Sequence, residues 1–184
     1  ADWEDKPDPS LFDKVIQSAQ RALELDPNDP EAQNNLGIVL REVGRFEEAA
    51  ENYKRAIILS PTFAEAYYNA GIINSDQCRL EEAQASFKYA IKLKFNYAEA
   101  YNNLGNTLKE LGKLKEAKTS YQQAIACRSN YAEAYNNLGT VFLLLEVLED
   151  AAANFLNATE LKFNYAEAHF NLGNTLRELG RLKE

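Results

Sequence analysis

Five asparagines are spaced evenly along the chain and could bind the backbone of a peptide. They are Asn35, Asn69, Asn103, Asn137 and Asn171, each 34 residues after the one before. A side-chain amide offers both donors and acceptors, so a row of amides can pair with an extended peptide whatever its side chains. Asparagine is a poor residue for a helix interior, and the residue preceding each asparagine varies while the asparagine does not. This favours a binding role over the alternative, simple copying of a duplicated segment.

A second candidate contact is a pair of leucines, Leu143 and Leu144. The equivalent pairs in the other copies of the repeat are polar: Arg41-Glu42, Ser75-Asp76, Lys109-Glu110 and Arg177-Glu178. The apolar core positions around the leucines are intact, so the leucines do not replace lost core residues. Exposed aliphatic clusters often mark contact sites, and we expect a partner to bind here. The alternative is that neighbouring chain collapses onto them.

No constellation typical of an enzyme is found in the sequence. The single histidine, His169, is expected to pack inside a helical hairpin, and no phosphate loop, nucleophile elbow or metal-ligand spacing occurs. We therefore expect no enzymatic activity, no catalytic residue, no cofactor and no metal. Cys78 and Cys127 are expected near opposite ends of a helix, too far apart for a disulfide. Two free thiols favour a reducing, cytoplasmic compartment, although a leader already removed would leave the same sequence.

The elements that position these residues form an internal repeat. Five glycines are also 34 residues apart: Gly37, Gly71, Gly105, Gly139 and Gly173. When each repeat is numbered from 1 to 34, the asparagines stand at position 6, the glycines at position 8 and the leucines at positions 12 and 13. Apolar residues recur at spacings of three and four in two blocks, which predicts two helices per repeat. Glycine at position 15 in three of the repeats predicts the turn between the two helices.

The sequence also indicates where the helices begin. Asp29 can cap a helix whose first residue is Pro30. In the later repeats Thr62, Asn96, Asn130 and Asn164 can each cap a helix, with a glutamate three residues further on, as in a capping box.

The predicted organisation is an acidic tail and a lone helix followed by repeats. The tail is 1–10, the helix is 11–29 with Ser10 as its cap, repeats 1 to 4 are 30–63, 64–97, 98–131 and 132–165, and a partial repeat 5 is 166–184. Because Glu184 falls early in the second helix of repeat 5, a truncated chain is expected, with more chain or a partner covering its last apolar face.

This pattern resembles the tetratricopeptide repeat (TPR) family over residues 30–184. The resemblance implies an all-α fold, a right-handed superhelical solenoid of antiparallel helix pairs whose first helices line a concave groove. It also implies a non-catalytic protein–protein interaction scaffold that binds a peptide or partner protein in that groove. The row at position 6 is similar to the asparagine ladder in the TPR arm of O-linked N-acetylglucosamine transferases. That similarity is to the arm only.

Charge narrows the set of partners. The net charge is −8, and nucleic-acid binding needs a basic face, so we expect no nucleic-acid partner. No apolar run approaches the roughly 20 residues that span a bilayer, so no membrane insertion is expected. The carboxylate clamp of other TPR proteins needs lysine at position 2, where all five repeats carry glutamate. The expected partner is a protein or an extended peptide.

Two alternatives to a free-standing scaffold remain at this stage. The chain could be the substrate-recruiting arm of a larger enzyme such as a glycosyltransferase, or a structural subunit of a multiprotein assembly.

Overall fold

The chain is built from short helices joined by loops of a few residues. The computed structural model describes residues 9–180, which contain no strand. The prediction of an all-α helical repeat fold is confirmed. Most of the predicted acidic tail, 1–10, lies outside the described residues, and so do residues 181–184 of partial repeat 5. No helix of the described part is both long enough and apolar enough to span a membrane.

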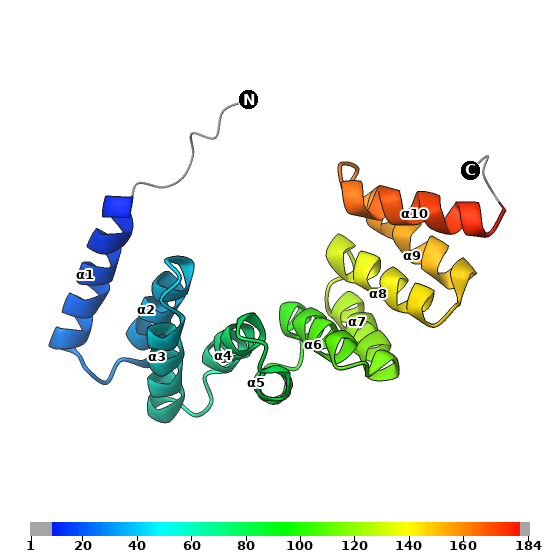
Figure 1. Cartoon of the computed structure of the whole chain (residues 1–184). Coiled ribbons are helices and arrows are strands. Elements are labelled where there is room, and N and C mark those ends of the chain that lie inside the picture. Colours follow the sequence, from blue (N-terminus) through cyan, green and yellow to red (C-terminus); the bar gives the residue numbers. More distant parts are fainter. Residues whose placement is uncertain (1–8, 181–184) are drawn as a thin grey trace. The chain divides into compact units, whose positions relative to one another are not determined.

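The chain divides into two compact units, Ala1–Leu93 and Lys94–Glu184, which are described separately. In the first unit the helices are α1 (Pro9–Leu25), α2 (Pro30–Glu42), α3 (Phe46–Leu59), α4 (Ala64–Asp76) and α5 (Leu80–Leu93) (Figure 1). In the second unit they are α6 (Ala98–Glu110), α7 (Leu114–Cys127), α8 (Ala132–Leu144), α9 (Leu148–Leu161) and α10 (Ala166–Glu178). The even-numbered helices from α2 on are the first helices of repeats 1 to 5, and they carry the asparagine row.

Helix α1 precedes the first repeat and covers one side of it. It begins at Pro9, so Ser10 lies inside the helix rather than capping it. Proline suits a first turn because the amide hydrogen that it lacks would have no acceptor there. Ile16 of α1 is buried in a cluster with Leu36 and Leu40 of α2, which fixes α1 against repeat 1.

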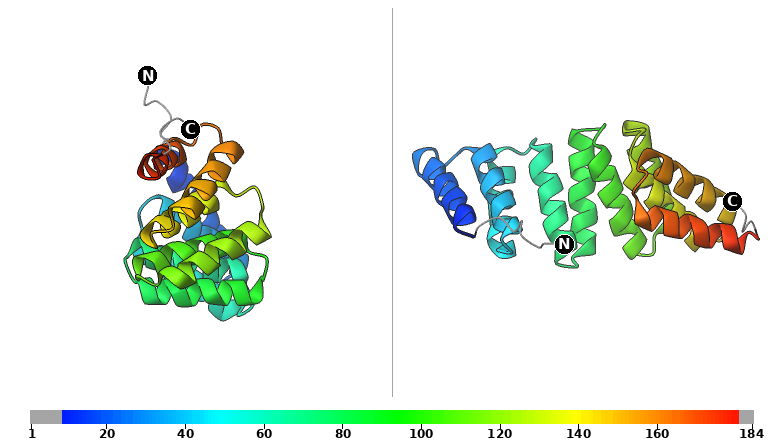
Figure 2. Two further views of the ribbon diagram at one scale, coloured as in Figure 1. Left: turned by 90° about the vertical axis from the view of Figure 1, so that its right-hand side faces the viewer. Right: turned by 90° about the horizontal axis from the view of Figure 1, so that it is seen from above.

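A contact between a glycine and an aromatic ring closes each complete hairpin. The glycine is at position 8 and the ring at position 24, in the pairs Gly37–Tyr53, Gly71–Phe87, Gly105–Tyr121 and Gly139–Phe155. A Cβ atom added to Gly71 would lie 2.6 Å from the Phe87 ring, closer than van der Waals contact allows. The two helices of each hairpin therefore lie side by side at a separation that only glycine permits (Figure 2).

The turns inside the hairpins need a left-handed backbone conformation. Gly44, Gly112 and Gly180 adopt it with φ of 80°, 72° and 71°. In repeats 2 and 4 the same conformation falls on non-glycine residues, Cys78 with φ 57° and Glu146 with φ 59°. Because a side chain in this region crowds its own backbone, these two turns are strained.

The predicted helix starts are right for α2 and wrong for the later repeats. Asp29 caps α2 by accepting hydrogen bonds from the backbone amides of Glu31 and Ala32. In the later repeats the cap positions fall one residue further on, at Phe63, Tyr97, Tyr131 and Tyr165, and none makes a side-chain cap hydrogen bond. The capping-box interpretation therefore fails, because the glutamates sit at the second helical position instead of the third.

Candidate functional site

The asparagine row is carried by the first helices of the repeats. Asn35 lies on α2 and Asn69 on α4 of the first unit, and Asn103, Asn137 and Asn171 lie on α6, α8 and α10 of the second. Asn35 is exposed, Asn69 is buried, and the other three are half-buried. In the second unit the structure thus places the row at the edge of the core, neither fully in solvent nor fully buried.

Asparagines at position 6 pair with asparagines at position 5 of the preceding repeat. In the first unit, Asn69 Nδ2 donates to Asn34 Oδ1 at 2.9 Å. In the second unit, Asn137 Nδ2 donates to Asn102 Oδ1 at 3.1 Å. Asn171 Nδ2 donates to Asn136 Oδ1, also at 3.1 Å. The row therefore has a structural role in joining neighbouring repeats.

Sequence reasoning missed the position 5 asparagines as partners of the row. Asn34, Asn102 and Asn136 are all buried, and a buried amide needs hydrogen-bond partners. Phe170 takes position 5 in repeat 5 and is 69% exposed. Tyr68 takes it in repeat 2, where its ring packs 5.9 Å from that of Phe87. Asparagine at position 5 is thus the available signal for the pairing.

An asparagine amide that makes one hydrogen bond can still make others. The group has two N–H donors and a carbonyl oxygen with two lone pairs. Asn137 uses one N–H on Asn102, which leaves a donor and an acceptor side by side. A peptide unit in an extended chain presents the complementary acceptor and donor. A half-buried position 6 amide can therefore hold its neighbour and a ligand backbone together.

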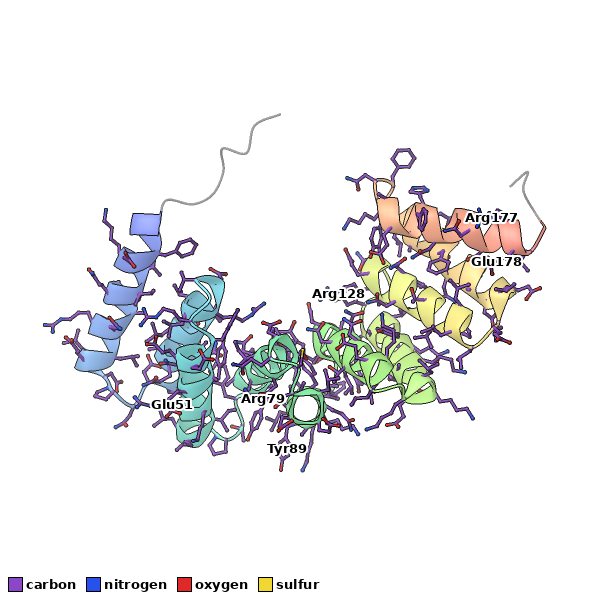
Figure 3. The ribbon with its side chains drawn as sticks, viewed as in Figure 1. Glu51, Arg79, Tyr89, Arg128, Arg177 and Glu178 are labelled. Carbon is purple, nitrogen blue, oxygen red and sulfur yellow. The ribbon has the colours of Figure 1, made fainter. Side chains whose placement is uncertain are left out.

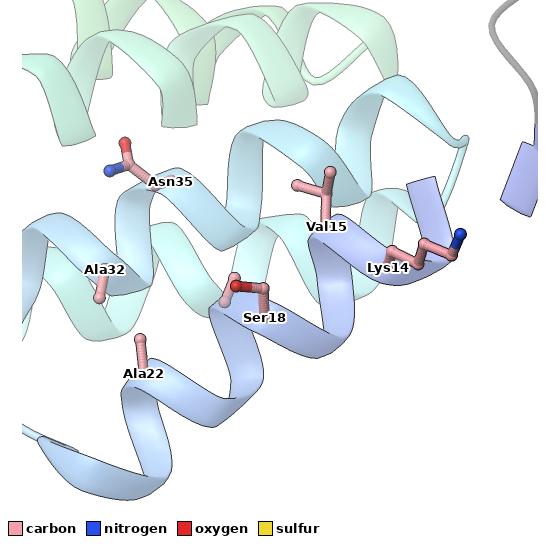
Figure 4. Close-up of a pocket in the computed structure, with 7 residues that line it drawn as sticks. Lys14, Val15, Ser18, Ala22, Ala32 and Asn35 are labelled. Atoms are coloured by element: carbon pink, nitrogen blue, oxygen red, sulfur yellow. The ribbon is translucent and has the colours of Figure 1, made fainter. Parts of the chain in front are cut away.

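The first member of the row lines a pocket. Asn35 is among the residues that line an open pocket of about 430 Å³ between α1 and α2, together with Val15, Ser18 and Ala22, and its amide points away from α1 (Figure 4). The lining is mostly apolar, with the Asn35 amide at its edge. The pocket extends the row toward α1.

The two leucines of repeat 4 differ in exposure. Leu144 is 55% exposed and the neighbouring Val147 is 37% exposed, whereas Leu143 is half-buried. Leu143 thus contributes partly to packing. Leu144 and Val147 form an exposed apolar surface at the end of α8.

Two of the glutamates at position 2, Glu99 and Glu133, are held by cations from the end of the same repeat. Arg128 donates a hydrogen bond to Glu99, and Lys162 Nζ donates to Glu133 Oε1 at 2.8 Å. Arg128, labelled in Figure 3, also lies 4.8 Å from the centre of the Tyr131 ring.

The two carboxyl groups respond to these cations. Burial of Glu99 opposes its ionisation, but the hydrogen bond from Arg128 and nearby positive charges outweigh burial and lower the pKa of Glu99. The hydrogen bond from Lys162 lowers the pKa of Glu133. Both position 2 carboxylates are therefore ionised and paired, and this surface is unsuited to bind a ligand carboxylate.

The remaining chemical residues do not assemble into a site. His169 is exposed, and its Nε2 lies 2.8 Å from the carbonyl oxygen of Phe163. The second helix of repeat 5, against which it is expected to pack, lies outside the described residues. Cys78 and Cys127 are free, as predicted, and both are exposed. Within residues 9–180 no cluster of three potential metal ligands occurs.

Comparison with known families identifies the repeat. Models described as TPR repeat or tetratricopeptide repeat match residues 18–51, 39–77, 64–97 and 105–146. The chain belongs to the tetratricopeptide repeat family. A comparison with the sequences of curated proteins finds no match.

Solved structures of other TPR proteins share the fold. The crystal structure of MamA is 29% identical, with a TM-score of 0.77, and the match covers 85% of this chain and 91% of MamA. YrrB, described as a TPR protein with an unusual peptide-binding site, is 26% identical with a TM-score of 0.77, covering 90% of this chain and 86% of YrrB. TTC0263 from Thermus thermophilus, described as a thermophilic TPR protein, is 23% identical with a TM-score of 0.70, covering 90% of this chain and 91% of TTC0263, and shows the fold alone.

Proposed function

We propose that this TPR chain is a non-catalytic scaffold that binds an extended peptide of a partner protein in the groove lined by the first helices of its repeats. The observation that carries the proposal is the unused hydrogen-bonding capacity of the paired asparagines. Asn137 and Asn171 are half-buried and each commits one N–H to the preceding repeat. Their remaining donor and acceptor suit a peptide backbone.

The pairing makes these amides better suited to binding. An amide already fixed to its neighbour loses less rotamer freedom when a ligand arrives, and such preorganisation lowers the cost of association. In the second unit, such pairs hold two consecutive position 6 side chains, Asn137 and Asn171. A row of fixed amides selects an extended backbone and tolerates varied side chains.

One comparison and one resemblance in the sequence support this use of the row. YrrB is described as having a peptide-binding site, and the position 6 asparagines are similar to the ladder in the TPR arm of O-linked N-acetylglucosamine transferases. The second similarity extends the proposal to the recruitment of a partner by its backbone. It would suit a free-standing scaffold, an arm of a larger enzyme or a subunit of an assembly equally well.

The test uses a displayed library of random linear peptides selected on the chain. The affinity of an enriched peptide is then measured for the wild type and for Asn137→Ala and Asn102→Ala. Both variants lose the same inter-repeat hydrogen bond, but only Asn137→Ala removes a row amide. We expect Asn137→Ala to weaken binding about two- to tenfold, at ~0.5–1.5 kcal/mol for a hydrogen bond. Asn102→Ala should weaken binding less, because the row amide remains and loses only its fixed orientation.

The matched pair separates binding from folding. Circular dichroism and thermal unfolding should show similar losses of stability for the two variants, because each leaves one amide of the pair without its neighbour. Equal affinities of the two variants would mean that the row only joins repeats. Failure of the library to yield any enriched peptide would contradict peptide binding itself.

A further inference from the structure

The polar residues at positions 12 and 13 pair across neighbouring repeats. Arg41, at position 12 of repeat 1, donates from Nε to Oδ2 of Asp76, at position 13 of repeat 2, over 3.1 Å. Position 12 of one repeat therefore faces position 13 of the next. The same register relates α6 to α8 and α8 to α10, which are in contact within the second unit.

The leucines of repeat 4 replace the polar partners that would pair with repeat 3 on one side and with repeat 5 on the other. Lys109, at position 12 of repeat 3, has Leu144 in the place that Asp76 holds in repeat 2. Glu178, at position 13 of repeat 5, has Leu143 in the place that Arg41 holds in repeat 1. Among the described residues neither Lys109 nor Glu178 forms an ion pair. Figure 3 shows Glu178 and its neighbour Arg177 on α10.

The result is an apolar surface with a positive charge on one side and a negative charge on the other. Leu144 and Val147 supply the exposed apolar part, and Lys109 and Glu178 supply the two charges. We call these four residues, with Leu143, the repeat 4 patch. A solvent-exposed leucine gains free energy when a partner covers it, and each charge gains from an opposite charge brought next to it.

We infer that the repeat 4 patch binds a partner segment carrying an apolar side chain flanked by an acidic residue toward repeat 3 and a basic residue toward repeat 5. This inference rests on the proposed peptide binding and adds a polarity to it. The asparagine row contacts only the backbone of the peptide. The patch selects among side chains and sets the order of acid and base along a peptide whose direction the asparagine row holds.

An experiment can measure the order of acidic and basic residues in the peptides that bind. The random peptide library is selected separately on the wild type and on the double reversal Lys109→Glu/Glu178→Lys. Peptides enriched on the wild type should carry an acid on one side of an apolar residue and a base on the other. Peptides enriched on the double reversal should carry the same residues in the opposite order, whichever direction the peptide runs.

Single reversals give further distinct results. Lys109→Glu leaves two negative charges beside the leucines and should enrich peptides with a base on both sides. Glu178→Lys should enrich peptides with an acid on both sides. A peptide selected on the wild type should bind each single reversal about two- to fivefold more weakly, which corresponds to exposed charge pairs.

A matched control changes the same charges elsewhere. The variant Lys115→Glu/Glu160→Lys alters exposed residues of α7 and α9 and also leaves the net charge unchanged. It should enrich the same peptides as the wild type. A changed charge order in this control would assign the effect to the overall field of the protein and contradict the patch.

The apolar part is tested by Leu144→Glu. This change gives Lys109 an acidic neighbour, as Asp76 is for Arg41, and should abolish both the selection for an apolar residue and the selection for an acid beside it. A peptide selected on the wild type should bind the variant about tenfold more weakly, at roughly 1.5 kcal/mol for a covered leucine. Thermal stability should be unchanged, because Leu144 is mostly exposed.

The outcomes separate this inference from the proposed function. Enriched peptides with no charge order, or an order that survives the double reversal, would overturn the patch while leaving peptide binding intact. A large loss of thermal stability in Leu144→Glu would place the leucine in the core and also overturn it. If no peptide is enriched on any variant, both proposals fail together.

Discussion

The Tyr121 hydroxyl donates a hydrogen bond to Asn106 Oδ1 over 2.7 Å, and the equivalent ring of repeat 1 has no such acceptor. Tyr53 takes the place of Tyr121, and Ile38 takes the place of Asn106. Within the described part of the chain, the buried Tyr53 hydroxyl has no hydrogen-bond partner. Two repeats with the same packing thus differ in whether the same polar atom is satisfied.

Removing the hydroxyl group should change the free energy of unfolding in opposite directions at Tyr53 and Tyr121. Tyr53→Phe removes a buried unpaired group and should leave the free energy of unfolding unchanged or raise it by about 1 kcal/mol. Tyr121→Phe removes a hydrogen bond and should lower it by about 0.5–1.5 kcal/mol. Urea unfolding of the two variants measures both effects. A loss of stability in Tyr53→Phe would mean that its hydroxyl has a partner after all.

Stability should fall at alkaline pH because of Tyr53. Burial raises the pKa of Tyr53 to about 12, whereas an unfolded tyrosine has a pKa of about 10. Below about pH 10 both states hold the proton, and above it the unfolded state loses its proton first, so the folded state becomes less favoured as pH rises toward 12.

The test compares melting temperatures across that pH range. The melting temperature of Tyr53→Phe should fall less steeply with rising pH than that of the wild type. Tyr89→Phe, at an exposed ring labelled in Figure 3, serves as the control and should decline as the wild type does. Identical curves for all three proteins would contradict the assignment to Tyr53.

Replacing the position 8 glycine by alanine should lower or raise the stability of the fold, depending on the repeat. At Gly139 a Cβ atom would lie 2.7 Å from the Phe155 ring, and such overpacking costs about 1–3 kcal/mol. At Gly173 nothing among the described residues lies within 4 Å of the added atom, so in the chain of 184 residues Gly173→Ala should gain up to ~1 kcal/mol from helix propensity. The melting temperature should therefore fall for Gly139→Ala and rise for Gly173→Ala. A shift of both melting temperatures in the same direction would contradict the ring contact as the cause.

Relieving the strained turn of repeat 4 should stabilise the chain. Glu146 has φ 59°, a conformation that costs a side-chain-bearing residue about 1–2 kcal/mol. Glu146→Gly should therefore raise the free energy of unfolding by about 1 kcal/mol. The reciprocal change, Gly112→Glu at φ 72°, should lower it by a similar amount. Differential scanning calorimetry of both variants provides the measurement, and a destabilised Glu146→Gly would show that the Glu146 side chain makes a contact worth more than the strain.

The sequence predicts most of the local structure because the determining residues are near one another. The spacing of apolar residues predicts two helices per repeat, and the structure adds that Gly71 of one helix meets a specific ring, Phe87, of the other. Asp29 and Pro30 predict the start of α2. These relationships lie within one helix or one hairpin, where spacing along the chain determines spacing in space.

Contacts between repeats are harder to predict. Asn69 and Asn34 are 35 residues apart, and their pairing depends on how two first helices are aligned, which helical periodicity does not determine. For the same reason, sequence reasoning assigned the five row asparagines only a ligand-binding role. Two of the glutamates assigned to capping boxes, Glu99 and Glu133, pair instead with cations near the end of the same repeat, Arg128 and Lys162.

The amide pair has a direction, with the donor on the later repeat and the acceptor on the earlier one. A repeat with asparagine at both positions, such as 98–131, brings an acceptor for its successor and a donor for its predecessor. An in-frame duplication of this segment in the gene would therefore recreate the bond at each new boundary. The scaffold can grow by whole units, and each added unit extends the row of amides by one.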